Sequence, residues 1–127
     1  MATPSRPLSP HLQIYKPQIT MVMSIAHRIT GMGLYFGTAL LVLWLLALAL
    51  GGDAQGFAQM IAASWFGQLV LFLMVWALFH HMLGGIRHFV WDFGHGFERG
   101  TRFAFAWATL IGGFVLAVLV WLFFVIL

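Results

Sequence analysis

Three long apolar stretches dominate the chain, at about residues 21–50, 64–90 and 103–127. Each is long enough for the ~20 helical residues that span the ~30 Å hydrocarbon layer of a bilayer. Backbone N–H and C=O groups in hydrocarbon must be paired internally, so such stretches form helices rather than open strands. The pattern predicts an all-α bundle of three transmembrane helices, forming a single domain over residues 1–127.

The polar segments between these stretches indicate how the chain is oriented. All four prolines lie before residue 18, so we expect the N-terminus to form an irregular, Pro-rich interfacial arm. The connection 51–63 carries one charge, Asp53, whereas the connection 91–102 carries two arginines. Together with Arg6 and Lys16 in the arm, this distribution of Lys and Arg predicts a cytoplasmic N-terminus. The arm resembles neither a secretory signal nor a transit peptide, which favours a bacterial inner membrane and a multi-pass protein there.

The composition limits the partners and cofactors that this chain can have. Hydrophobic residues make up 62% and charged residues 7% of the chain, against about 25% charged in soluble domains. The net charge of +3 arises without a basic cluster, so we expect membrane lipid and not nucleic acid as a partner. The absence of cysteine excludes thiolate zinc sites, Cys-ligated iron–sulfur clusters and covalently attached haem. A redox role would therefore use a cofactor held by histidine, and non-covalent haem fits this restriction.

The first group of polar residues inside an apolar stretch consists of Ser24, His27, Arg28 and Gly31. Their spacing places them on one helix face near the cytoplasmic end, where we expect them to share a neighbour. The Ser24 hydroxyl and the Arg28 guanidinium suit a quinone carbonyl that gains negative charge on reduction. Arg28 could equally bind a haem propionate. The alternative is an interfacial Arg that extends toward water beside a helix-capping Ser.

The second group consists of His81, Gly85, His88 and Asp92, which lie within ~20–40° of one another around the helix. His80 points elsewhere. Glycine at 84 and 85 leaves clearance beside His81 for a flat macrocycle, and neutral imidazole is a good ligand for haem iron. The alternative interpretation of His81 is a buried histidine that is hydrogen-bonded in the protein core.

Depth in the membrane separates the roles of these histidines. His81 lies about ten residues, or ~15 Å, from the cytoplasmic end of its helix, and His88 lies near the surface. We expect His27 to be level with His88 rather than with His81. His27 and His88 are then poor axial partners for His81 but suitable neighbours for haem propionates. Since three helices can hardly enclose a haem alone, the second axial ligand is expected from another subunit.

These residues also carry a resemblance to a known family. The chain resembles the cytochrome b556 subunits of succinate dehydrogenase over nearly its whole length, although its third helix matches by hydrophobicity alone. The matching positions form an N-terminal and a central motif: Arg6, Pro7, Leu8, Leu12, Ser24, His27, Arg28 and Thr30, then His81, Gly85, Ile86, Arg87, His88, Trp91, Asp92 and Gly94.

The resemblance implies a membrane anchor in a four-subunit complex. A flavoprotein subunit oxidises succinate, an iron–sulfur subunit relays electrons, and two anchors bind haem b and ubiquinone. In the family, the residue matching His81 is an axial haem ligand, and the residues matching Ser24 and Arg28 line the quinone site. The residue matching His27 lies near the propionates, where we also place Arg28 and His88. The second axial His comes from the other anchor.

Three questions stay open at this point. The doublet of His80 and His81 offers two candidate ligands, and the spacing to Gly85 and His88 favours His81. His80 and Asp92 have no assigned role. The alternatives to a succinate dehydrogenase cytochrome are the anchor of a fumarate reductase, which runs the reverse reaction, and a haem-free structural anchor.

Overall fold

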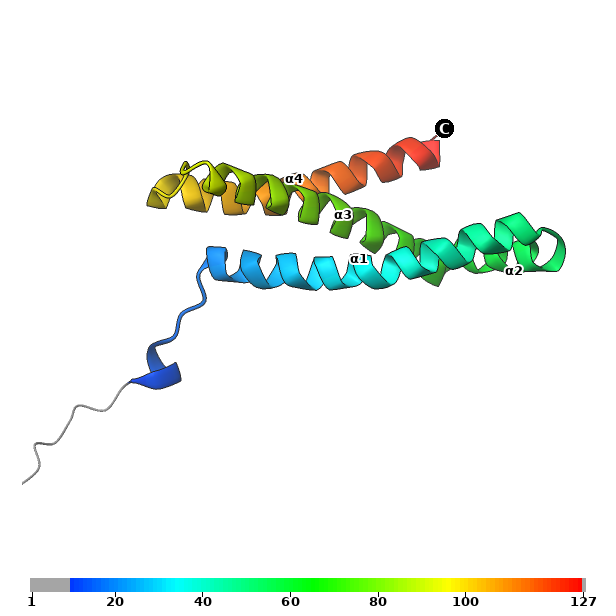
Figure 1. The fold of residues 1–127 in the computed structure, drawn as a ribbon, viewed down its shortest axis with the longest axis horizontal. Helices are drawn as coiled ribbons and strands as arrows, with labels where there is room; N and C mark the ends of the chain where they lie inside the picture. Colours follow the sequence, from blue (N-terminus) through cyan, green and yellow to red (C-terminus); the bar gives the residue numbers. More distant parts are fainter. Residues whose placement is uncertain (1–9, 127) are drawn as a thin grey trace, which may run out of the picture.

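The computed structural model describes residues 10–126, and that part of the chain is helical and contains no strand (Figure 1). The elements, in chain order, are a short 3-10 helix η1 (His11–Ile14) and the helices α1 (Ile19–Leu50), α2 (Gly52–Ala63), α3 (Trp65–Asp92) and α4 (Arg99–Ile126). The helices α1, α3 and α4 are long and apolar enough to cross a membrane. The predicted all-α fold with three transmembrane helices is confirmed.

The main difference from the prediction is α2, which occupies the segment expected to be a connection. Gly51 and Gly52 have positive φ values of 68° and 54°, which end α1 and turn the chain. Asp53 then lies in the first turn of α2, where a negative charge favours the helix dipole. The exposed Phe57 and Ile61 follow at helical spacing. These apolar positions were a signal for a short helix that the glycines obscured.

The corner between α2 and α3 is held by side chain to backbone hydrogen bonds. The Ser64 hydroxyl donates to the Ile61 carbonyl at 2.6 Å and accepts from the Gly67 amide at 3.1 Å, capping α3. The Gln68 amide donates to the Ala62 carbonyl at 2.8 Å. A side chain at Gly67 would collide with the Ile61 carbonyl, so the corner requires glycine there.

Small residues let the long helices approach one another closely, as is usual in membrane bundles. A β-carbon at Gly37 of α1 would overlap Met74 of α3, and one at Gly113 of α4 would lie 3.0 Å from the His80 Cα atom of α3. The helices α3 and α4 meet along much of their length, and α1 lies beside α3 (Figure 1).

The bundle leaves most of its apolar surface uncovered. In the most apolar part of α1, just 6% of the residues are buried within the chain, against 22% in α4. Lipid or other membrane helices must cover this surface.

The arm before α1 has little regular structure in its described part. Pro17 lies two residues before α1, and residues 10–18 contain just the turn of η1. Arg6, Pro7 and Leu8, the first three residues of the N-terminal motif, lie outside the described residues, as does Pro4.

Candidate functional site

Two histidines from different helices stack against each other where α1 and α3 cross. The rings of His27 and His81 are parallel within 4°, and their centroids are 3.9 Å apart. Two glycines provide the space for this contact. A β-carbon at Gly31 would lie 2.8 Å from Cε1 of His81, and one at Gly84 would collide with the His27 ring. The pair therefore depends on glycine in both helices.

Hydrogen bonds determine which ring nitrogen of His81 is free. Its Nδ1 atom lies 3.1 Å from the His27 carbonyl oxygen, which can only accept, so Nδ1 carries the proton and donates. The Thr30 oxygen lies 3.5 Å from the same nitrogen, while its own hydroxyl is directed at the Ala26 and His27 carbonyls, 2.9 and 3.0 Å away. The neutral imidazole then has its lone pair on Nε2, which is the arrangement of a metal-ligating histidine supported by a backbone carbonyl.

His27 lies deeper than the sequence suggested. Its ring contacts His81 at 3.9 Å and His88 at 5.3 Å, so the expectation that His27 is level with His88 rather than His81 is wrong. The reason is the way α1 crosses α3, where glycine at 31 and 84 leaves space for the His81 and His27 rings to meet. The two rings still cannot bracket one metal ion, because they are stacked face to face. His27 is therefore a neighbour of His81 and not a second candidate ligand for the same ion.

Ser24 and Arg28 differ from His27 and Gly31 in their exposure. Both are exposed, whereas His27 and Gly31 are directed toward α3. The four residues extend over about 100° of the helix, and the expectation that they share one neighbour stays a prediction. Ser24 does not cap α1, since Gln18 occupies the N-cap position. The Ser24 hydroxyl and the Arg28 guanidinium remain available to a group outside this chain.

The other polar residues of α3 divide between two faces. His88 and Asp92 are exposed on the side of His81, and no atom lies within 4 Å of a β-carbon built on Gly85. His80 is fully buried and faces α4, as its close approach to Gly113 shows. Arg87 is also buried; it belongs to the matched motif, but no pattern in the sequence indicated its burial.

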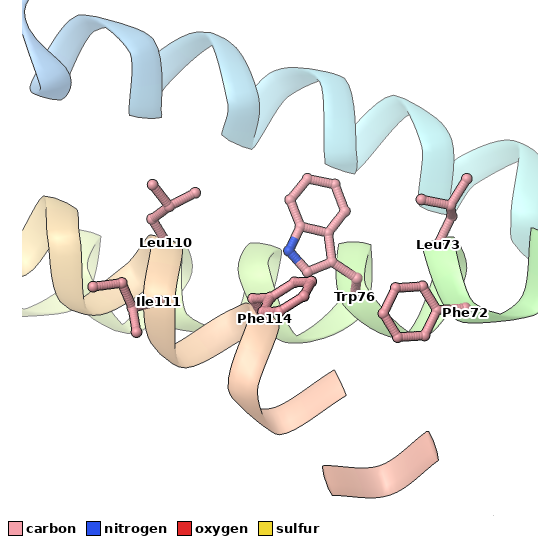
Figure 2. Close-up of a pocket in the computed structure, with 6 residues that line it drawn as sticks. All are labelled: Phe72, Leu73, Trp76, Leu110, Ile111 and Phe114. Carbon is pink, nitrogen blue, oxygen red and sulfur yellow. The ribbon is translucent and has the colours of Figure 1, made fainter. Parts of the chain in front are cut away.

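A pocket of about 450 Å³ between α3 and α4 contains no polar group (Figure 2). Figure 2 shows side chains from both helices around it: Phe72, Leu73 and Trp76 from α3, and Leu110, Ile111 and Phe114 from α4. Such a lining can accommodate hydrocarbon but offers no group for catalysis or metal binding. The candidate site is therefore the histidine pair and its surroundings.

The residues around His81 fit an axial ligand to a haem. One imidazole nitrogen is free, its partner nitrogen is held by a backbone carbonyl, and the helix surface at Gly85 is unobstructed. Within residues 10–126 no three His, Asp or Glu side chains converge on a point where they could hold a free metal ion. That finding does not bear on a haem, whose iron takes four ligands from the porphyrin.

Comparison with known proteins identifies a family that this chain matches over nearly its whole length. Residues 2–126 match the family model described as succinate dehydrogenase/fumarate reductase transmembrane subunit. The chain is 40% identical over 115 residues to the succinate dehydrogenase cytochrome b556 subunit of Paracoccus denitrificans, which covers 91% of this chain and 88% of that protein.

Two further relatives extend the match to another bacterium and to a mammal. The cytochrome b556 subunit from Rickettsia conorii is 37% identical over 116 residues, covering 91% of this chain and 90% of the relative. The mitochondrial cytochrome b560 subunit of Mus musculus is 36% identical over 119 residues, covering 91% and 67%. By its sequence and its three apolar helices, the chain belongs to the family of transmembrane subunits of succinate dehydrogenase and fumarate reductase.

Proposed function

We propose that this chain is the haem b-binding anchor of a succinate:quinone oxidoreductase and helps to pass electrons from an iron–sulfur subunit to ubiquinone. The observation that carries the proposal is the 3.1 Å distance between Nδ1 of His81 and the His27 carbonyl oxygen, from which we infer that Nδ1 donates and Nε2 is free. The cytochrome names of the relatives support a haem, and the family supports an anchor role.

In this proposal His81 provides one axial ligand of the iron through Nε2. Bound there, the haem would supply a one-electron carrier inside the bilayer. His27 holds the His81 ring by stacking and by its carbonyl, so that the ligand nitrogen is fixed before the haem binds. Arg28 and His88 lie at the same end of the bundle and serve the propionates as cationic or hydrogen-bonding partners.

Ser24 and Arg28 form the share of the quinone site that this chain contributes. They are one helical turn apart and exposed in this chain, so a quinone held there lies between this chain and a partner. The Ser24 hydroxyl can donate to a quinone carbonyl. The Arg28 guanidinium then stabilises the negative charge that develops on the oxygen during reduction.

The proposed function requires other subunits beside this chain. Residues 10–126 place no second imidazole where it could bind the same iron as His81, so we assign the other axial His to a second anchor subunit. The exposed apolar surface of α1 suits such a neighbour, with lipid covering the rest. The iron–sulfur subunit delivers electrons and the flavoprotein subunit oxidises succinate, which does not reach this chain. In this arrangement the single domain crosses the inner membrane of a bacterium three times, with the N-terminus in the cytoplasm.

A difference spectrum of the complex, purified in mild detergent through a tag on this chain, tests the proposal. A b-type haem band that appears on adding succinate supports a haem connected to succinate oxidation. A band that appears with dithionite alone would contradict that connection and favour the fumarate reductase alternative. No band with either reductant would leave a haem-free structural anchor.

The assignment of Ser24 and Arg28 to the quinone site is tested by replacing each residue. We expect Arg28→Leu to lower quinone reductase activity roughly 100-fold, because the transition state loses a fixed charge, and Ser24→Ala to lower it roughly tenfold. Reduction of an artificial dye that takes electrons upstream should be unchanged in both variants.

The matched control for Arg28→Leu is Arg99→Leu, which removes an exposed arginine at the same end of the bundle. This control should keep both activities. Equal losses of quinone and dye reduction in Arg28→Leu would show damage upstream and would rule out the quinone assignment.

A further inference from the structure

A second cluster of polar side chains, away from His81, lies between α3 and α4. Arg87 is 5% exposed, and its Nε and Nη1 atoms have no hydrogen-bond partner within residues 10–126. The same holds for the indole nitrogen of Trp91 and for Nε of Arg102. These groups can only donate hydrogen bonds. We call Arg87, Trp91 and Arg102 the donor cluster.

Arg87 and Trp91 of the donor cluster are in contact on α3, and Arg102 lies on α4. The Arg87 guanidinium carbon lies 5.0 Å from the centre of the Trp91 ring, a cation–π contact that stabilises the charge only in part. Arg102 lies in the first turn of α4, seven residues before Thr109, and so on the same helix face. Thr109 is buried and its hydroxyl donates to the Phe105 carbonyl at 2.8 Å, which leaves its oxygen free to accept.

Next to Arg87 there is a pocket of about 140 Å³. Arg87 and Thr109 are the polar members of its lining, and the remainder are Leu83, Ile86, Val90, Phe105 and Ala108. Ile86 and Ala108 are exposed, so the pocket opens to the outside of the bundle. A buried charge beside an apolar opening suits a molecule with an anionic group and a hydrocarbon tail.

The position of the pocket argues against the haem and the second anchor as its occupants. On α3 its residues lie about 140° to 240° around the helix from His81, on the side away from α1. The depth of the pocket in the membrane also bears on its occupant. Arg87 is five residues before the end of α3, or ~7.5 Å, where the polar headgroups meet the hydrocarbon.

We propose that this pocket binds an anionic phospholipid, with the phosphate on the donor cluster and an acyl chain along the apolar lining. An unpaired buried guanidinium is costly in hydrocarbon, and a phosphate accepts two parallel hydrogen bonds from it. Arg102 of the donor cluster adds positive charge at the same end, which attracts anionic lipids to that membrane surface. The proposed lipid would fix the end of α3 that carries His81 and His88.

The test measures lipid retained by the purified complex after extensive detergent washing. Native mass spectrometry should detect one phosphatidylglycerol per chain when that lipid is added back, with phosphatidylcholine bound about tenfold more weakly. Arg87→Gln should reduce retention of phosphatidylglycerol by about tenfold or more. The matched control Arg99→Gln removes the same charge from an exposed position and should retain the lipid.

A second variant tests the same pocket in case Arg87→Gln does not fold. Ala108→Phe fills the mouth of the pocket without changing any charge and should also lose the lipid. Equal retention of phosphatidylglycerol by Arg87→Gln, or by Ala108→Phe, would overturn the proposal. So would binding of inorganic phosphate alone to the washed complex, or a carboxylate of another subunit on Arg87 in a structure of the complex.

Discussion

His81→Phe should remove the b-type haem from the complex, whereas the neighbouring His80→Phe should leave it bound. Phenylalanine keeps the flat shape of the ring and can still stack on His27, so α1 and α3 should remain packed. It cannot bind iron, and it also loses the hydrogen bond to the His27 carbonyl. We expect less than about a tenth of the wild-type haem content, since an axial ligand is the main protein bond to the iron.

His80→Phe is the matched control because it makes the same change one residue earlier. The His80 ring lies between α3 and α4, and neither of its nitrogens has a hydrogen-bond partner in the described chain. Replacing it removes two buried polar atoms without touching the histidine pair. Haem content measured by the pyridine haemochrome method, normalised to flavin, gives the answer. Loss of haem in His80→Phe with retention in His81→Phe would transfer the ligand role to His80.

The sequence predicted the three spans well because their signal is strong. Each is a run of apolar residues longer than the bilayer requires, and the backbone has no alternative to a helix in hydrocarbon. The missed helix α2 has a weaker signal. Its glycines and its single charge, Asp53, resemble those of a loop, and the helix packs beside α1 and α3, which periodicity alone does not reveal.

The candidate site could be predicted in part. The spacing of His81 and Gly85 indicated one helix face, and the structure places both as expected. The spacing in the sequence could not indicate that Gly84 makes room for His27 rather than for a cofactor beside His81. That arrangement depends on how α1 crosses α3. The position of His27 was missed for the same reason.

The packing of α4 against α3 explains why the burial of Arg87 was not predicted. In a membrane helix a lone Arg near the end is expected to extend toward water. Here Phe105, Ala108 and Thr109 of α4 lie beside Arg87, and its side chain is buried instead. Burial of this kind is a property of two helices together and has no signature in one.

Gly31→Val should weaken haem binding roughly five- to 150-fold, although Gly31 itself has no group that could touch an iron. A β-carbon at this position would lie 2.8 Å from Cε1 of His81, so the ring must rotate or α1 must move away. Rotation costs about 0.5–1.5 kcal/mol, and the lost hydrogen bond from Nδ1 to the His27 carbonyl costs a similar amount. The sum of about 1–3 kcal/mol corresponds to the stated range.

Gly33→Val is the control, because it lies two residues further along the same helix and has no atom within 4 Å of its added β-carbon. Both variants carry the same β-branched residue, so they share any effect on helix propensity. Haem titration of the apo-complex should separate them, and the redox midpoint of residual haem should shift in Gly31→Val alone as the support of the ligand changes. Identical haem affinity in the two variants would mean that the contact of Gly31 with His81 does not position the His81 imidazole. The stacked histidines would then move freely when the haem binds.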